Sequence, residues 1–68
     1  MFNKSKIIMM DNKIDIINYK NIDHFDDNKI IIKLDNYNIF IYGENLIISR
    51  LVSDEVLISG NINKLEFR

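Results

Sequence analysis

Short apolar runs broken by asparagine and aspartate are the feature that most constrains the fold of this 68-residue chain. Fifteen isoleucines make up most of these runs, and ten asparagines stand largely between them. The branched isoleucine side chain favours a pleated strand, whereas asparagine and aspartate favour tight turns. The chain has no alanine, which is the best helix former, and no proline. The pattern therefore predicts an all-β fold of short strands and tight turns.

Alternation of apolar and polar residues predicts six to seven short, mainly antiparallel strands in a meander. We expect strands over residues 6–10, 13–19, 29–35, 37–42, 46–51 and 55–59, and a last strand that ends near Phe67. Turns are expected at residues 11–12, 26–28, 35–36 and 53–54, and at the two glycines, Gly43 and Gly60. Residues 20–28 form a polar segment between strands. Such a meander forms a curled sheet or small roll, and a short β-solenoid-like stack is the alternative.

Residue parity along these strands assigns one apolar face to the core. Its members are Ile30, Ile32, Leu34, Ile39, Ile41, Leu46, Ile48, Val56, Ile58, Leu65 and Phe67. Ile62 has the wrong parity relative to Leu65, which predicts a bulge or bend near Asn63-Lys64.

The opposite face also carries large apolar residues, which is unusual for a sheet face in contact with water. These residues are Ile31, Phe40, Tyr42, Ile47 and Leu57. Closure of the sheet into a roll or an interface with another protein would cover them, and both interpretations remain open. We take these five residues as the candidate protein interface.

Length and composition narrow the class of protein further. The chain is expected to be one domain over residues 1–68, with a flexible N-terminus over residues 1–5. It has no cysteine and one histidine, so disulfides are excluded and a zinc site is not expected. A domain this small has a marginal core, which points to a protein partner or self-association as a further source of stability.

Charge and hydropathy exclude other partners. The net charge of −1 and the mixed signs along the chain argue against a nucleic-acid partner. The apolar run over residues 7–10 is too short for a signal peptide or a membrane span, so a cytoplasmic protein is expected.

No residue pattern predicts catalysis, a cofactor or a metal. His24 lies among Asp23, Asp26, Asp27 and Asn28, but no nucleophile accompanies it, and these oxygen ligands lack the spacing of an EF-hand loop. A solvated turn is the simpler interpretation. The second hypothesis for function is a ligand- or single-stranded nucleic-acid-binding β module, in which Phe40 and Tyr42 stack on a base or ring.

Three blocks of sequence resemble the YabP/YqfC family of sporulation proteins. They are the block Ile16-Ile17-Asn18-Tyr19-Lys20-Asn21-Ile22-Asp23-His24-Phe25 with Ile30-Ile31-Ile32, the block Ile39-Phe40-Ile41-Tyr42-Gly43-Glu44-Asn45-Leu46-Ile47-Ile48, and the block Asp54-Glu55-Val56-Leu57-Ile58-Ser59-Gly60-Asn61-Ile62 with Leu65-Glu66-Phe67. The second block resembles the family pattern I-x-G-x-x-L-x-I, and the third resembles E-V-x-I-x-G-x-I-x-x-L-x-F. The Asn18-Tyr19 segment and the ending at Phe67 look closer to the YqfC branch.

The resemblance implies a non-enzymatic role in endospore formation, connected with the coat and cortex and located in the mother cell. It carries over no catalytic residue. The expected role is that of a small interaction or assembly module that binds a protein partner or itself, with a membrane-associated sporulation protein among the candidate partners.

Overall fold

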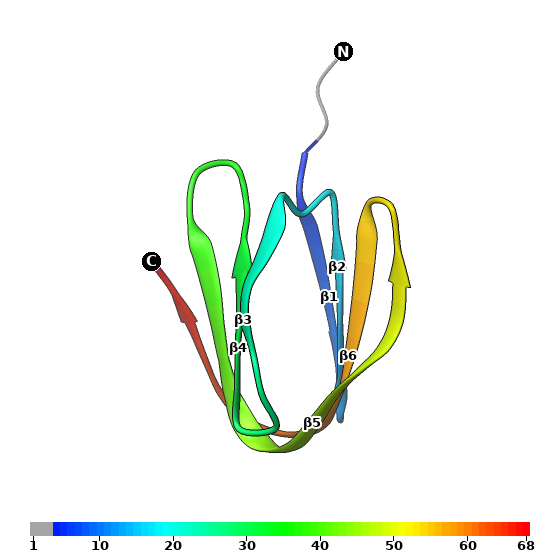
Figure 1. Cartoon of the computed structure of the whole chain (residues 1–68), viewed down its shortest axis with the longest axis vertical. Coiled ribbons are helices and arrows are strands. Elements are labelled where there is room, and N and C mark those ends of the chain that lie inside the picture. Colours follow the sequence, from blue (N-terminus) through cyan, green and yellow to red (C-terminus); the bar gives the residue numbers. More distant parts are fainter. Residues whose placement is uncertain (1–3) are drawn as a thin grey trace.

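The structure is a computed structural model that describes residues 4–68. Its strands are β1 (Lys6–Met10), β2 (Lys13–Ile17), β3 (Asn21–Phe25), β4 (Lys29–Lys33), β5 (Asn38–Val52) and β6 (Glu55–Phe67). They form one antiparallel sheet in the order β1-β2-β6-β5-β4-β3 (Figure 1). The predicted all-β fold with a curled sheet is confirmed. The flexible N-terminus expected over residues 1–5 falls in part on residues 1–3, which lie outside the described residues.

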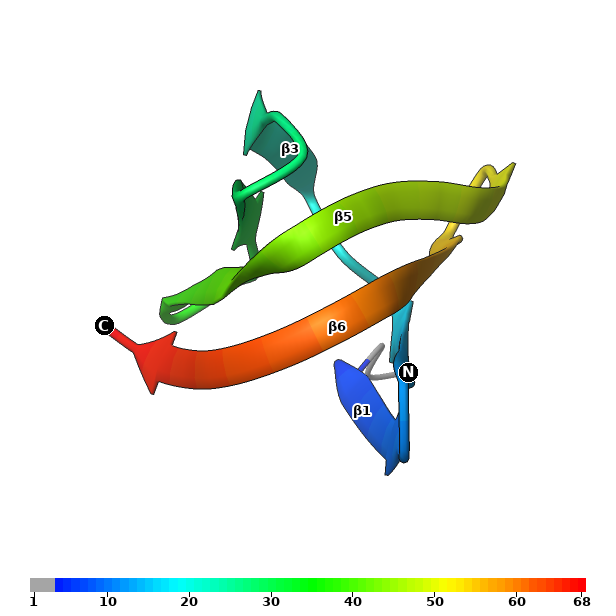
Figure 2. The ribbon, with the colours of Figure 1, turned by 90° about the horizontal axis from the view of Figure 1, so that it is seen from below.

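The sheet has the shape of a U because β5 and β6 are long and bend together near their middles (Figure 1). The β1–β2 arm contains β1, β2, residues 55–60 of β6 and residues 46–52 of β5. The β3–β4 arm contains β3, β4, residues 38–43 of β5 and residues 61–67 of β6. Figure 2 shows β5 and β6 side by side as they cross from one arm to the other. The sheet therefore has an inner face between the arms and an outer face that points away on both sides.

Irregular backbone at the bend allows β5 and β6 to continue instead of reversing. The sequence predicted turns at Gly43 and Gly60, but the structure places both glycines inside these strands. Gly60 has a φ of 134° and Asn45 a φ of 54°. The pairing of β5 with β6 also shifts register between Tyr42 and Gly43 and again between Glu44 and Ile47. Bulges of this kind bend a strand without ending its pairing.

Two hairpin turns hold the bend in place. The N–H of Gly43 donates to the carbonyl of Asn28 in the β3–β4 turn, at 3.0 Å. The N–H of Gly60 donates to the carbonyl of Asn12 in the β1–β2 turn, at 3.1 Å. Each short hairpin thus satisfies backbone groups that the bend removes from the ladder.

The order of the strands departs from a simple meander at one connection. β2 pairs with β6, and the chain then crosses to the other edge of the sheet, where β3 pairs with β4. The sequence predicted a polar segment where β3 lies. A register shift between Ile22 and His24 interrupts the alternation of apolar and polar residues, so the sequence pattern did not indicate a strand there.

The core lies between the two arms of the U. Its buried residues are Ile14, Ile16, Ile30, Ile32, Leu34, Ile39, Ile41, Leu46, Val56 and Ile58. Parity predicted eight of these ten correctly, and β2 supplies the other two. Ile48 and Leu65 are partly buried against the core, while Phe67 is largely exposed at the end of β6. The predicted bulge near Asn63 is confirmed, because Tyr42 pairs with Lys64 and the next residue of β5 pairs with Ile62.

Candidate functional site

The bend divides the five predicted interface residues between two surfaces. Ile31, Phe40 and Tyr42 lie on the outer face of the β3–β4 arm, where Ile31 pairs with Phe40. Ile47 and Leu57 lie on the outer face of the β1–β2 arm. The two groups share one side of the sheet but face away from each other, because the sheet curls between them (Figure 1).

Cations cover the aromatic rings on the β3–β4 arm. The guanidinium of Arg68 lies 4.5 Å from the ring centroid of Phe40, and the ammonium of Lys64 lies 5.5 Å from that of Tyr42. Both distances are within the range of a cation–π interaction. A base that stacked on either ring, as the second hypothesis requires, would have to displace one of these cations.

Glu66 holds both cations in position. Its Oε2 lies 3.0 Å from the Nζ of Lys64, and its Oε1 accepts from Nη2 of Arg68 at 2.6 Å. Hydrogen bonds from Lys64 and Arg68 hold the pKa of Glu66 below its ordinary value. The carboxylate stays charged and keeps the cations near the rings.

The outer face of the β1–β2 arm is more apolar and more exposed. Ile47 exposes 55% of its surface, and Leu57 is half-buried. Ile8, Met10 and Val52 are also exposed on this face, and sequence reasoning did not select them. The sequence of β1 contained an indication, because its four consecutive apolar residues, 7–10, must point to both faces of the strand.

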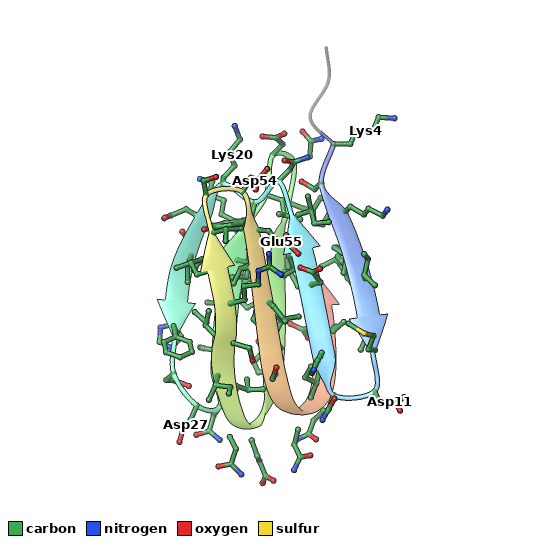
Figure 3. The ribbon with its side chains drawn as sticks, turned by 90° about the vertical axis from the view of Figure 1, so that its right-hand side faces the viewer. Lys4, Asp11, Lys20, Asp27, Asp54 and Glu55 are labelled. Atoms are coloured by element: carbon green, nitrogen blue, oxygen red, sulfur yellow. The ribbon has the colours of Figure 1, made fainter. Side chains whose placement is uncertain are left out.

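A pair of carboxyl groups lies within this apolar surface. Asp15 pairs with Ile8 on one side and with Leu57 on the other, and its Oδ1 is buried with no hydrogen-bond partner among residues 4–68. A hydrogen bond with Asp15 raises the pKa of Glu55 on the neighbouring strand. Figure 3 looks onto this arm and shows Glu55 near its tip, just below Asp54.

Asp26, one of the acidic residues near His24, stabilises the turn between β3 and β4. Asp26 Oδ1 accepts hydrogen bonds from the backbone N–H groups of Asn28 and Lys29, at 2.8 and 2.7 Å. Its Oδ2 lies 2.8 Å from Nε2 of His24. These contacts, the one with His24 first, lower the pKa of Asp26 from 3.8 to about 2. The aspartate thus shapes a tight turn.

This turn makes stability depend on pH in a narrow acidic range. A depressed carboxyl pKa stabilises the folded state above the ordinary value of 3.8, and this stabilisation is lost as the pH falls toward about 2. We expect a carboxyl titration followed by NMR to give Asp26 a pKa of about 2, and a higher value in His24→Gln. The Asp26→Asn variant should lose this part of the pH dependence. An Asp26 that titrates near 3.8 in the wild-type protein would contradict the geometry.

Other polar groups offer little chemistry. Among residues 4–68, no three His, Cys, Asp or Glu side chains lie close enough together to hold a metal ion. The hydroxyls of Ser49 and Ser59 contact each other across β5 and β6, on the arm opposite His24. A pocket of about 200 Å³ near the tips of the arms is lined by Asn18, Tyr19, Lys20, Asp35 and Asp54. Its Lys20 is already paired with Asp35, at 3.1 Å.

The geometry defines a small, curled β-sheet protein whose distinctive chemistry lies on its two outer faces. A family model, that of the YabP family, matches residues 2–68 and so covers the chain. The chain belongs to the YabP family, as the sequence resemblance indicated, and the match does not distinguish the YqfC branch. No curated protein matches the sequence significantly.

Family membership suggests a sporulation-related protein, and the YabP family is not known as a family of enzymes. Within residues 4–68, no helix is long and apolar enough to cross a membrane.

Proposed function

We propose that this protein is a non-enzymatic assembly module of endospore formation that binds a protein partner through the outer face of its β1–β2 arm. It acts in the cytoplasm of the mother cell, in the formation of the coat and cortex. Its partner is another sporulation protein, for which a membrane-associated one is a candidate, or a second copy of the chain. Family membership supports the sporulation role.

The observation that carries the interaction role is the set of exposed apolar side chains on this face. Ile8, Met10, Ile47 and Val52 come from the two edge strands of the arm, and half-buried Leu57 lies between them. A cluster of exposed apolar residues on one face usually marks an interaction site. The carboxyl groups of Asp15 and Glu55 lie among them, and polar groups of this kind give an interface specificity.

The edges of this arm offer a second means of attachment. Within the described part of the chain, β1 and residues 46–52 of β5 have a neighbouring strand on one side only. Their free backbone groups can pair with an extended segment of a partner, and the exposed apolar side chains beside them would cover that segment.

The Ile47→Lys variant tests this function. We expect it to fold, because Ile47 is exposed and surface substitutions change stability by about 0.5 kcal/mol or less. Its association should weaken by about tenfold or more, since a lysine ammonium would have to be desolvated in the interface. The measurements are sedimentation of the purified protein, capture of partners from extracts of sporulating cells, and a sporulation assay.

Asn36→Lys is the matched control. Asn36 is exposed in the turn between β4 and β5, so this substitution adds the same charge far from this face. The control should associate and sporulate as the wild type does. Three results together would contradict the proposal. The wild-type protein would be a monomer at high concentration, it would capture no partner from the extract, and cells that carry Ile47→Lys in its place would sporulate normally.

A further inference from the structure

The outer face of the β3–β4 arm differs chemically from the face assigned to the proposed function. Across the strands, Lys29 pairs with Tyr42, and Tyr42 pairs with Lys64. At the other end of the arm, Lys33 pairs with Asn38, whose backbone exchanges hydrogen bonds with that of Arg68. Four cations, two at each end of the arm, therefore surround a centre made of Ile31, Phe40 and Tyr42.

The anions of this face are held by neighbouring groups. Asp26 accepts from the backbone N–H of Lys29 and contacts His24, which pairs with Ile31. Glu66 lies between Lys64 and Arg68, and it exposes 27% of its side chain, whereas the two cations expose 61% and 60%. The carboxylate is thus the least exposed group of the trio, and the cationic groups are the more accessible to a partner. Asp23 lies at the β3 edge, where it accepts a hydrogen bond from Asn21. The four cations outnumber the carboxylates of Glu66, Asp23 and Asp26, so the face is positive although the chain as a whole has a net charge of −1.

Among residues 4–68, two of the four cations have no anionic partner. Lys64 and Arg68 are paired with Glu66, but in the part of the chain that the structure describes neither Lys29 nor Lys33 forms an ion pair. Both belong to β4, four residues apart, which corresponds to about 13 Å along a strand. An extended polypeptide with carboxylates four residues apart has the same spacing.

We propose that the outer face of the β3–β4 arm binds an extended, acidic polypeptide segment, whose carboxylates pair with Lys29 and Lys33 first and with Lys64 and Arg68 next. Charge complementarity supplies the attraction. The aromatic rings contribute by holding the cations in place rather than by stacking on a ligand.

Two other classes of partner fit this surface less well. A single-stranded nucleic acid would stack its bases on aromatic rings, but the rings of Phe40 and Tyr42 are already occupied by Arg68 and Lys64. An anionic membrane would gain from apolar side chains that insert into it, and on this face Ile31, Phe40 and Tyr42 are only partly exposed.

A direct binding experiment tests the proposal. A labelled peptide of alternating glutamate and serine is titrated with the full chain and followed by fluorescence anisotropy at low and at physiological salt. We expect binding that weakens as salt increases. The Lys29→Glu/Lys33→Glu double variant should bind at least tenfold more weakly, and the milder Lys29→Gln/Lys33→Gln variant should show a smaller loss in the same direction.

The matched control is Lys6→Glu/Lys13→Glu, which changes the charge by the same amount on the outer face of the other arm. It should keep peptide binding within about twofold of the wild type. Circular dichroism verifies that each variant is folded. If both charge-reversed variants lost peptide binding equally, the loss would reflect the overall charge of the protein. That result would overturn the assignment of the binding site to this face.

Oligothymidine and anionic lipid vesicles are titrated in parallel. Tighter binding of either one than of the peptide, abolished by Lys29→Gln/Lys33→Gln, would overturn the choice of partner, and absence of salt-dependent peptide binding would overturn the proposal itself. The Ile47→Lys variant separates this result from the proposed function, because it lies on the other arm and should bind the peptide normally.

Discussion

Replacing Ile58 with alanine is expected to lower the free energy of unfolding by about 2–5 kcal/mol. Ile58 has no exposed surface and pairs with Ile14 on one side and with Ile48 on the other, so the substitution leaves a cavity between the arms. A domain of this length has a total stability of about 3–10 kcal/mol. The variant should therefore lose a large part of its total stability.

Chemical denaturation measures this effect through the midpoint of unfolding. Ile41→Ala should behave in the same way, because Ile41 is equally buried on the β3–β4 arm. Ile8→Ala is the control, since Ile8 is exposed on the outer face. An unchanged midpoint for Ile58→Ala or Ile41→Ala would show that the inner face of the sheet has been assigned incorrectly.

Alanine at either glycine of the bend is the second large effect that we expect. A Cβ atom at Gly43 would overlap the backbone carbonyl oxygen of Asn61. A Cβ atom at Gly60 would lie 2.6 Å from the carbonyl oxygen of Asn45, and the φ of 134° at Gly60 is strained for any residue with a side chain. The neighbouring atoms are backbone and cannot rotate away.

The cost of overpacking is about 1–3 kcal/mol at each position, and backbone strain adds about 1–3 kcal/mol at Gly60. Glu44→Ala is the matched control, because Glu44 is exposed in the same bend and its substitution should change stability by about 0.5 kcal/mol or less. The measurement is the denaturation midpoint of each variant. If both glycine variants were as stable as Glu44→Ala, the two long strands could not approach each other as closely as described.

The bend also determines what the protein can bind. A flat sheet would present Phe40 and Ile47 on one surface, and a variant with lysine at both positions would test one interface. In the curled sheet these residues lie on opposite arms, so each substitution tests a separate surface. An exposed apolar face on one side and a cationic face on the other would allow the protein to hold two partners of different chemistry at once.

The candidate site was predictable only in part. Residue parity correctly predicted that five residues point away from the core, because alternation is a property of each strand by itself. These residues are Ile31, Phe40, Tyr42, Ile47 and Leu57. The covering of Phe40 by Arg68 and of Tyr42 by Lys64 depends on the pairing of β5 with β6, which no local pattern specifies. The exposure of Ile8 and Met10 likewise follows from the position of β1 at the edge of the sheet.

Local sequence patterns predicted the strand-forming segments other than β3, most of the core and the turns at residues 11–12, 26–28, 35–36 and 53–54, since alternation and turn propensity act over a few residues. Tertiary structure alone decided that β2 pairs with β6 and that the chain bends at Gly43 and Gly60 without reversing. A glycine permits a turn and a bulge equally well. The choice between them depends on the partners of its backbone groups, and here these are Asn28 and Asn12, which are distant in sequence and are brought close only by the finished sheet.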